Sequence, residues 1–431
     1  MKKKKLALHW KIILGILFGI IAGIFFIQFA WGKEFVVNWI KPFGTIFINL
    51  LKLIAIPLII ASLIKGISDL KDISQLSKMG MRTLGIYIFT TVMAIGVGLI
   101  LVNVIQPGNF ISDETRTDML GTFGGTVGEK MLEVETVKQQ GPLQPLVDIV
   151  PENIFESASS NGNMLQVIFF TILCGVGLVL LPEDKSSPVK KIFDSANELV
   201  LKLVDIIMLS APFGVFALMA SLVAESPSAD IFVALGMYGL TVLLGLVILV
   251  FGVYGALLKF LGKANVMEFY RKFAPAQLVA FSTSSSAATL PVTMERVEEH
   301  IGVHKEVSSF VLPIGATVNM DGTSLYQGVA AVFIAQVFGY DLTLMQQLSI
   351  LMTATLASIG AAAVPGAGIL MLVIVLESIG INPAGIALIF AVDRPLDMCR
   401  TAVNVTGDAI VSVIINRSTG RELTPTAEDM D

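Results

Sequence analysis

The last long apolar segment, residues 382–415, most constrains what this chain can fold into. It is hydrophobic enough to cross a bilayer, yet it carries Asp393, Asp397, Arg400, Asn404 and Asp408 at spacings of 4, 3, 4 and 4 residues. One helix would hold all five within a stripe roughly 80° wide. Charges at membrane depth normally face a protein interior or an aqueous cavity, so the stripe predicts a binding surface or a pore lining. The alternative is a buried salt-bridge network that only joins helices, although three carboxylates against one guanidinium fit that less well.

The composition predicts an all-helical membrane protein that crosses the bilayer several times. Of its 431 residues, 54% are hydrophobic and only 15% are charged, whereas a soluble domain has about 25% charged residues. No basic, aromatic-rich patch suggests a nucleic-acid partner. Cys174 and Cys399 lie in apolar segments and show no metal or disulfide spacing.

Charge-poor apolar segments predict the individual spans and their orientation. The early spans are expected near residues 12–32, 43–63, 84–105, 165–181, 199–223 and 231–261. The lysine-rich start could belong to a signal peptide, but no small-residue cleavage site follows, so we expect a retained helix. Basic residues gather in both tails and in the loops after the second, fourth and sixth spans. This pattern predicts cytoplasmic termini and an even number of crossings in the inner or plasma membrane.

Two polar, small-residue runs interrupt the later apolar segments. Phe281–Pro291 reads FSTSSSAATLP and Ala357–Gly368 reads ASIGAAAVPGAG. Each run is typical of the tip of a helical hairpin that enters the membrane and turns back. The first run ends 28 residues before Asn319, and Pro365 lies 28 residues before Asp393, so the arrangement recurs at an offset of 74. Such pairs indicate a transporter's binding site; the alternative is a chance likeness between two packing segments.

Another interruption, NMDGT at Asn319–Thr323, supplies oxygen ligands inside an apolar helix. Gly322 weakens the helix there and can leave carbonyl groups free. Together with Asp408 and Asn404, this segment makes a hard-oxygen set that suits an alkali cation better than a transition metal. The excess of carboxylates at membrane depth must be neutralised by bound cations or protons. The residues therefore predict coupling to a cation.

At these residues the chain resembles the dicarboxylate/amino acid:cation symporter family, which includes the archaeal aspartate transporters and the excitatory amino-acid transporters. Four motifs carry the resemblance: SSSAATLP (Ser284–Pro291), NMDGT (Asn319–Thr323), ASIGAAAVPGAG (Ala357–Gly368) and LDMCRTAVNVTGD (Leu396–Asp408). The resemblance extends over most of the chain and is weakest in Gly108–Gln144. Together the four motifs are very specific, although any one alone is not.

The resemblance implies a homotrimer of elevator-type transporters with inverted repeats. Residues 1–431 would form one transporter unit of eight transmembrane helices and two re-entrant hairpins. The scaffold and trimer contacts would come mainly from 1–80 and 106–228, and the moving transport part from 81–105 and 229–418. Hairpin 1 would span about 265–298 and hairpin 2 about 344–377, and residues 419–431 would form a cytoplasmic tail.

The resemblance also implies a substrate site for an acidic amino acid. Arg400 would hold the side-chain carboxylate and Asp397 the amino group, and chemistry supports both roles because a guanidinium grips a carboxylate bidentately and a carboxylate suits an ammonium. A plain dicarboxylate has no ammonium for Asp397, which favours an amino acid. The remaining substrate-binding residues would be Thr323, Asn404, Thr401, Ser284, Ser285, Ser286, Ala361, Val364 and Gly366.

The family pattern implies sodium as the coupling ion and no organic cofactor. One sodium site would use Asn319, Asn404, Asp408 and the carbonyl of Gly315. A second would use Tyr87, Thr90, Thr91, Asn319 and Asp321. A third would use carbonyls of Thr317, Ser358, Ile359 and Ala361. Taken alone, Tyr87, Thr90 and Thr91 would indicate ordinary helix packing.

Three positions depart from relatives in the family. Gln327 stands where vertebrate members carry a glutamate linked to proton and potassium countertransport, so we expect neither. Ser284 stands where archaeal members have an arginine. Met398 stands where vertebrate members have the arginine that replaces the archaeal one. Arg394 is expected to supply that charge from a third position by pairing with Asp393.

These patterns predict a non-enzymatic symporter that couples sodium entry to the uptake of aspartate or glutamate. A proton- or sodium-coupled symporter of C4-dicarboxylates or neutral amino acids is the alternative within the same class. An anion channel is the alternative from another class, since the polar stripe could line a pore. An intramembrane hydrolase could use the serines at 284–286 as nucleophiles, but no predicted span carries a histidine to serve as base.

Overall fold

The computed structural model describes residues 8–68, 77–117, 150–159, 163–225, 230–359 and 366–425, which form helices, turns and loops without a strand. This confirms the all-helical prediction for those residues. The first half contains α1 (Leu8–Phe26), α2 (Gly32–Phe35), α3 (Lys41–Ser68), α4 (Ser77–Ile105), α8 (Ile154–Ala158), α9 (Met164–Leu180) and α10 (Glu183–Glu225). The second contains α11 (Asp230–Val247), α12 (Gly255–Phe260), α13 (Val266–Thr283), α14 (Ser286–Glu295), α15 (Lys305–Val318), α16 (Asp321–Val337), α17 (Leu344–Ile359), α18 (Ala367–Ser378) and α19 (Ile386–Ser418). π-helical turns at Val36–Ile40, Ile248–Tyr254 and Arg296–Ile301 continue α2, α11 and α14, and short 3₁₀ turns cover Pro107–Phe110 and Pro383–Gly385.

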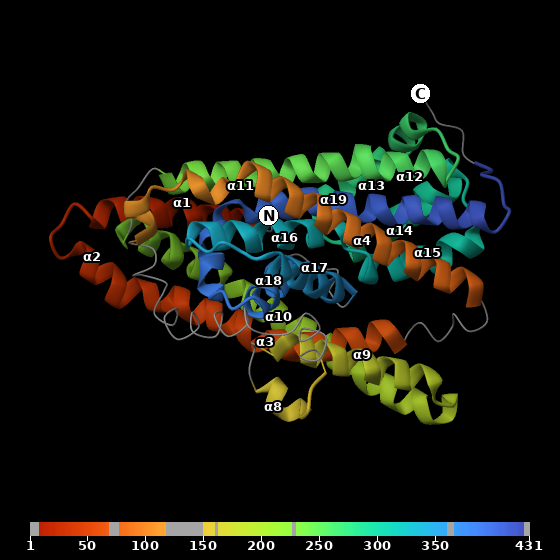
Figure 1. Cartoon of the computed structure of the whole chain (residues 1–431), viewed down its shortest axis with the longest axis horizontal. Helices are drawn as coiled ribbons and strands as arrows, with labels where there is room; N and C mark the ends of the chain where they lie inside the picture. Colours follow the sequence, from red (N-terminus) through yellow and green to blue (C-terminus); the bar gives the residue numbers. More distant parts are fainter. Residues whose placement is uncertain are drawn as a thin grey trace, which may run out of the picture.

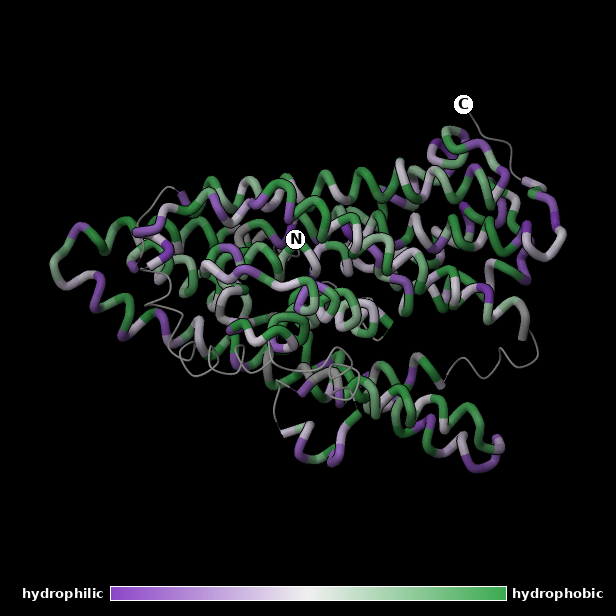
Figure 2. Tube along the Cα trace, viewed as in Figure 1, coloured by the Kyte–Doolittle hydropathy of each residue, from purple (hydrophilic) through white to green (hydrophobic). Residues whose placement is uncertain are grey.

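Several of these helices are built for a membrane. Within the described residues, four are long and apolar enough to cross one, at Gly32–Lys65, Met79–Phe110, Asp230–Phe260 and Val392–Ser418. Glu183–Val204 and Leu209–Glu225, bent by 45°, could form a fifth. Leu240 and Val247 of α11 and Phe251 of the π-helical turn after it are more than half exposed. Figure 2 shows apolar residues along the lengths of the helices, with polar ones gathered near many of the turns. Large exposed apolar surfaces suit lipid rather than water.

Glycines allow α1 and α10 to pack closely. A Cβ atom added at Gly15 would lie 2.4 Å from the Pro212 carbonyl oxygen, and one at Gly19 would lie 2.5 Å from the Phe216 carbonyl oxygen. At Gly23 it would lie 2.7 Å from the Cβ of Val223. Small residues at every fourth position let helix backbones approach inside a membrane, where association depends on close packing.

Replacing Gly19 by valine should therefore separate α1 from α10. We expect Gly19→Val to lower the free energy of unfolding by about 1–3 kcal/mol through overpacking, seen as a lower Tm in thermal unfolding of the detergent-solubilised protein. Gly177→Val is the matched control, because a Cβ there meets nothing within 4 Å. An equal loss of stability in both variants would contradict the packing explanation.

Two groups of helices make up the molecule (Figure 1). In one group, α10 packs along α1 and α3, and α3 also packs against α9. In the other, α16 contacts α4, α11, α17, α18 and α19. Contacts of α18 with α3, and of α10 with α19, join the two groups. Helix α16 is thus enclosed by helices from several parts of the chain.

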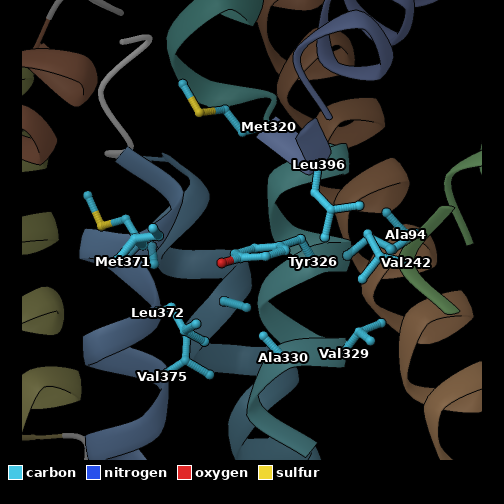
Figure 3. Close-up of a cluster of buried hydrophobic side chains, with 14 of the residues drawn as sticks. Ala94, Val242, Met320, Tyr326, Val329, Ala330, Met371, Leu372, Val375 and Leu396 are labelled. Carbon is cyan, nitrogen blue, oxygen red and sulfur yellow. The ribbon is translucent and has the colours of Figure 1, made fainter. Parts of the chain in front are cut away.

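The enclosure of α16 places the start of this helix in the interior. All of its side chains are buried except that of Gln336. Figure 3 shows Tyr326 of α16 with Met371 and Leu372 of α18 on one side and Ala94 of α4 on the other. Because the apolar core surrounds the helix, the polar residues at its first turn are cut off from solvent.

The later helices break where the sequence predicts interruptions. Ser284, between α13 and α14, has a left-handed backbone with φ of 51°, uncommon for a residue other than glycine. The Ser285 side chain then accepts a hydrogen bond from the Ala288 N–H and caps α14. Another break at Asn319 and Met320 separates α15 from α16, whereas α19 is continuous. The paired helices α13 and α14, and likewise α17 and α18, pack against each other.

Candidate functional site

Helix α19 buries its whole polar stripe. The exposed fractions are 5% for Asp393, 6% for Asp397, 0% for Arg400, 3% for Asn404 and 2% for Asp408. The 3.6-residue period of the helix explains why one face carries them all. The face meets α16 and the first turn of α18, so the five side chains point into the protein and away from lipid.

Arg400 is the centre of the first cluster on this face. Its Nη2 donates to Asp397 Oδ1 at 2.9 Å and to Asp393 Oδ1 at 3.1 Å, and its guanidinium carbon lies 3.6 Å from the ring centre of Tyr326. Its Nη1 and Nε atoms are buried and have no hydrogen-bond partner among the described residues. Buried charged donors are costly without partners. Their free N–H groups can therefore accommodate a carboxylate ligand.

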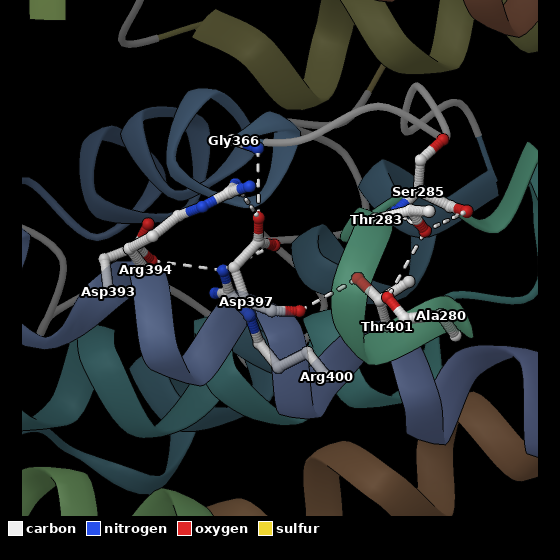
Figure 4. Close-up of polar contacts among 9 residues, drawn as sticks. All are labelled: Ala280, Thr283, Ser285, Gly366, Asp393, Arg394, Asp397, Arg400 and Thr401. Carbon is white, nitrogen blue, oxygen red and sulfur yellow. Dashed lines mark hydrogen bonds and ion pairs between the residues drawn. The ribbon is translucent and has the colours of Figure 1, made fainter. Parts of the chain in front are cut away.

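The carboxylate of Asp397 joins this cluster to the start of α18. Its Oδ2 accepts hydrogen bonds from Arg394 Nη1 at 3.0 Å and from the Gly366 N–H at 3.3 Å (Figure 4). The prediction that Arg394 pairs with Asp393 is wrong. Consecutive residues on a helix diverge by about 100°, whereas residues three apart lie on one face, so Arg394 reaches Asp397 while Asp393 turns to Arg400.

These ion pairs change where the unbalanced charge lies. Arg394 and Arg400 match Asp393 and Asp397 in number, and the salt bridges join all four side chains. No positive charge of this cluster is left to neutralise Asp408, the carboxylate further along the stripe. The excess negative charge therefore lies with Asp408 and its neighbours.

Asn404 links the two parts of the stripe. Its Oδ1 accepts from the Gly322 N–H at 2.8 Å, and its Nδ2 donates to Thr323 Oγ1 at 3.2 Å. Gly368 of α18 lies against the same place, because a Cβ there would be 3.2 Å from both Arg400 Nη1 and Thr323 Cγ2. The structure thus brings Thr323, Asn404 and Arg400 together beside the start of α18.

Contacts of the other expected substrate residues are more local. The Thr401 hydroxyl donates to the carbonyl of Asp397 at 2.8 Å. Ser284, Ser285 and Ser286 are buried at the break before α14, which packs against α19. The Ser284 hydroxyl has no hydrogen-bond partner within the described ranges. Ala361 and Val364 lie outside the described residues.

A second cluster surrounds Asp321 and consists of oxygen-bearing groups. The carboxylate of Asp321 accepts from Thr91 Oγ1 at 2.7 Å on one oxygen and from the Tyr254 hydroxyl at 2.6 Å on the other. Thr90 donates to Asn319 Oδ1 at 3.3 Å. All five residues are buried. Helix α4 therefore meets the break before α16 through its hydroxyl groups.

Asp408 brings α19 and α15 into the same cluster. Its Oδ1 accepts from Asn319 Nδ2 at 3.0 Å. A Cβ at Gly315 would lie 2.5 Å from both Asp408 Oδ1 and the Tyr87 hydroxyl, which itself donates to the carbonyl of Val311 at 3.0 Å. Carboxylate, amide and hydroxyl oxygens from several helices thus converge, and no cysteine or histidine joins them among the described residues, as a hard cation requires.

The described contacts do not test the third expected sodium site, whose ligands would be backbone carbonyls. Thr317 is exposed, and its hydroxyl bonds the carbonyl of Ile314. The Ser358 hydroxyl likewise bonds the local carbonyl of Thr355, and Ile359 is partly buried at the end of α17. The fourth residue, Ala361, is not among the described residues.

Sequence reasoning missed two tyrosines of the site. Tyr254 ends a π-helical turn after α11, and Tyr326 lies under Arg400. Both stand in apolar helices, where an isolated tyrosine gives no signal of its own. One clue was available in the motif NVTGD, since a Cβ at Gly407 would come 2.5 Å from the Tyr254 hydroxyl. A side chain at that position would exclude the tyrosine.

Comparisons with known proteins identify the family of this chain. Residues 8–418 match the sequence profile of the Sodium:dicarboxylate symporter family. The proton/sodium-glutamate symport protein of Geobacillus stearothermophilus is 36% identical over 420 residues, covering 97% of this chain and 96% of the relative. The proton/glutamate-aspartate symporter of Escherichia coli (strain K12) is 35% identical over 418 residues, covering 96% of this chain and 93% of the relative. Excitatory amino acid transporter 4 of Mus musculus is 34% identical over 438 residues, covering 88% of this chain and 78% of the relative. The chain therefore belongs to the sodium:dicarboxylate symporter family.

Proposed function

We propose that this protein is a symporter that couples sodium entry to the uptake of aspartate or glutamate. The buried Arg400, with Nη1 and Nε lacking partners among the described residues, is the observation that carries the proposal. Names of relatives that include glutamate, aspartate, sodium and proton support it. We expect no enzymatic activity.

Each charged group of an acidic amino acid has a proposed partner in the first cluster. The side-chain carboxylate binds the free edge of Arg400, because a guanidinium can donate two parallel hydrogen bonds. The ammonium binds Asp397. The remaining carboxylate lies near Thr323 and Asn404, with contributions from Thr401 and from the hairpin breaks, at the proposed positions 284–286, 361, 364 and 366.

The second cluster is the proposed place of the coupling ions. Asp321 and Asp408 supply charge that the neighbouring arginines do not balance, and Asn319, Thr90, Thr91, Tyr87 and the backbone at Gly315 supply oxygen atoms. Alkali cations prefer such hard oxygen ligands. Asn404 is a proposed ligand of both the substrate and a cation, so it can link the binding of the two. Carbonyls at 317, 358, 359 and 361 stay proposed ligands of a third ion.

The two helix groups correspond to the proposed elevator. The group of α1, α3, α9 and α10 falls within the scaffold ranges 1–80 and 106–228. The group around α16 carries the site and, apart from the first four residues of α4, falls within the transport ranges 81–105 and 229–418. Eight spans, two re-entrant hairpins, cytoplasmic termini in a cell membrane and a homotrimer complete the proposal.

Uptake into proteoliposomes tests the function directly. We expect saturable uptake of radiolabelled L-aspartate or L-glutamate under an inward sodium gradient, and little uptake when choline replaces sodium. Uptake driven by a proton gradient alone would still support a symporter but would contradict sodium as the coupling ion. Uptake of only C4-dicarboxylates or neutral amino acids would overturn the substrate assignment. Non-saturable anion flux without concentrative uptake would favour a channel.

A further inference from the structure

We propose that Arg394 is an internal counter-ion of Asp397 which the ammonium group of the substrate displaces. Arg394 thereby becomes a specificity-determining residue that lowers the preference of the site for amino acids over plain dicarboxylates. The inference rests on the proposed function, in which Asp397 receives the ammonium, and it adds how the substrate-free protein keeps that carboxylate paired.

The contacts of Asp397 show what an incoming ammonium must exchange. Arg394 Nη1 and the Gly366 N–H both donate to Oδ2, at 3.0 and 3.3 Å, whereas Arg400 Nη2 donates to Oδ1 at 2.9 Å. An ammonium that binds the carboxylate must compete with one of the two guanidinium groups. Two cations on one carboxylate, with a third added, would repel one another.

Arg394 is the guanidinium that can move. The Arg400 side chain is fully buried, is shared with Asp393 and stacks on Tyr326 at 3.6 Å. The Arg394 side chain is 15% exposed, and among the described residues Asp397 is its one ion-pair partner. Its Nε has no hydrogen-bond partner within the described ranges. A long, partly exposed side chain with one partner can leave without opening the packed core.

Displacement makes the site sensitive to the ammonium group. An amino acid replaces the Arg394 contact with its own cation, so Asp397 stays neutralised after the exchange. A dicarboxylate such as succinate lacks the ammonium and leaves the Arg394–Asp397 pair in place. Removing Arg394 therefore removes a competitor for amino acids but exposes an unpaired Asp397 to the dicarboxylate.

Competition binding separates these effects. Inhibition constants of L-aspartate and succinate would be measured against radiolabelled aspartate for the wild type, Arg394→Met and Arg394→Gln. A general loss of positive charge weakens the binding of both dicarboxylic ligands. The ratio of the two inhibition constants therefore isolates the effect of the ammonium group. We expect the succinate-to-aspartate ratio to rise about tenfold in both neutral variants, the scale of one hydrogen bond to a charged group.

Arg394→Lys is the matched control, because it keeps the charge and should keep the ratio close to that of the wild type. Size-exclusion profiles of both neutral variants would verify folding. An unchanged ratio in Arg394→Met and Arg394→Gln, or an equal rise in Arg394→Lys, would overturn the inference. A wild type that does not bind aspartate would instead overturn the proposed function, so the two failures are distinguishable.

Discussion

Arg400→Met is expected to abolish concentrative uptake of aspartate and glutamate. The substitution removes the N–H groups proposed for the substrate carboxylate, and it leaves Asp393 and Asp397 with one guanidinium fewer. Truncating one partner of a buried, hydrogen-bonded charge pair weakens binding by about 2–5 kcal/mol, so kcat/KM should fall by at least about 30-fold. The measurement is sodium-driven uptake at equal amounts of reconstituted protein.

Two further variants separate the guanidinium from its charge and its position. Arg400→Lys keeps a cation but cannot donate bidentately, so we expect uptake well below that of the wild type. Arg417→Met removes an arginine from the last turn of the same helix and should leave KM unchanged. Uptake by Arg400→Met within tenfold of the wild type would contradict the carboxylate assignment.

Asp321→Asn is expected to raise the sodium concentration that uptake requires. The carboxylate supplies a full charge and is held by hydroxyl groups at 2.6 and 2.7 Å, whereas an amide supplies no charge and one oxygen. The sodium concentration that gives half-maximal uptake should rise more than about tenfold, because a charge-assisted interaction is lost. Uptake of aspartate as a function of sodium concentration measures the change.

The Tyr254 hydroxyl offers a graded test of the same cluster. Tyr254→Phe loses only the hydrogen bond that holds Asp321, so it should raise the half-maximal sodium concentration by less, about tenfold at most. Tyr270→Phe is the control, because its hydroxyl bonds the carbonyl of Val250 and not the cluster. Unaltered sodium dependence in Asp321→Asn would exclude this cluster as the cation site.

Helical periodicity made part of the site predictable. The spacing of Asp393, Asp397, Arg400, Asn404 and Asp408 requires one face of a helix, and the structure buries that face. The interruptions at Ser284 and Asn319 were also visible, because small and polar residues break an apolar run. Both predictions depend on local chain geometry, which the order of residues determines.

Contacts between distant helices were not predictable in the same way. Spacing along α19 places Arg394 near two carboxylates but does not decide which one it meets, because Arg400 competes for Asp393. Tyr254 contacts Asp321 only because α11, α16 and the gap at Gly407 come together. Such contacts depend on how helices approach and rotate.

The sequence by itself determined the membrane class, the polar stripe, the helix breaks and the oxygen-rich composition of the site. Only the tertiary structure decided that the two arginines balance Asp393 and Asp397 and that the unbalanced charge lies with Asp321 and Asp408. The reason is physical: periodicity sets the direction of a side chain on its own helix, whereas its electrostatic partner depends on distances between helices.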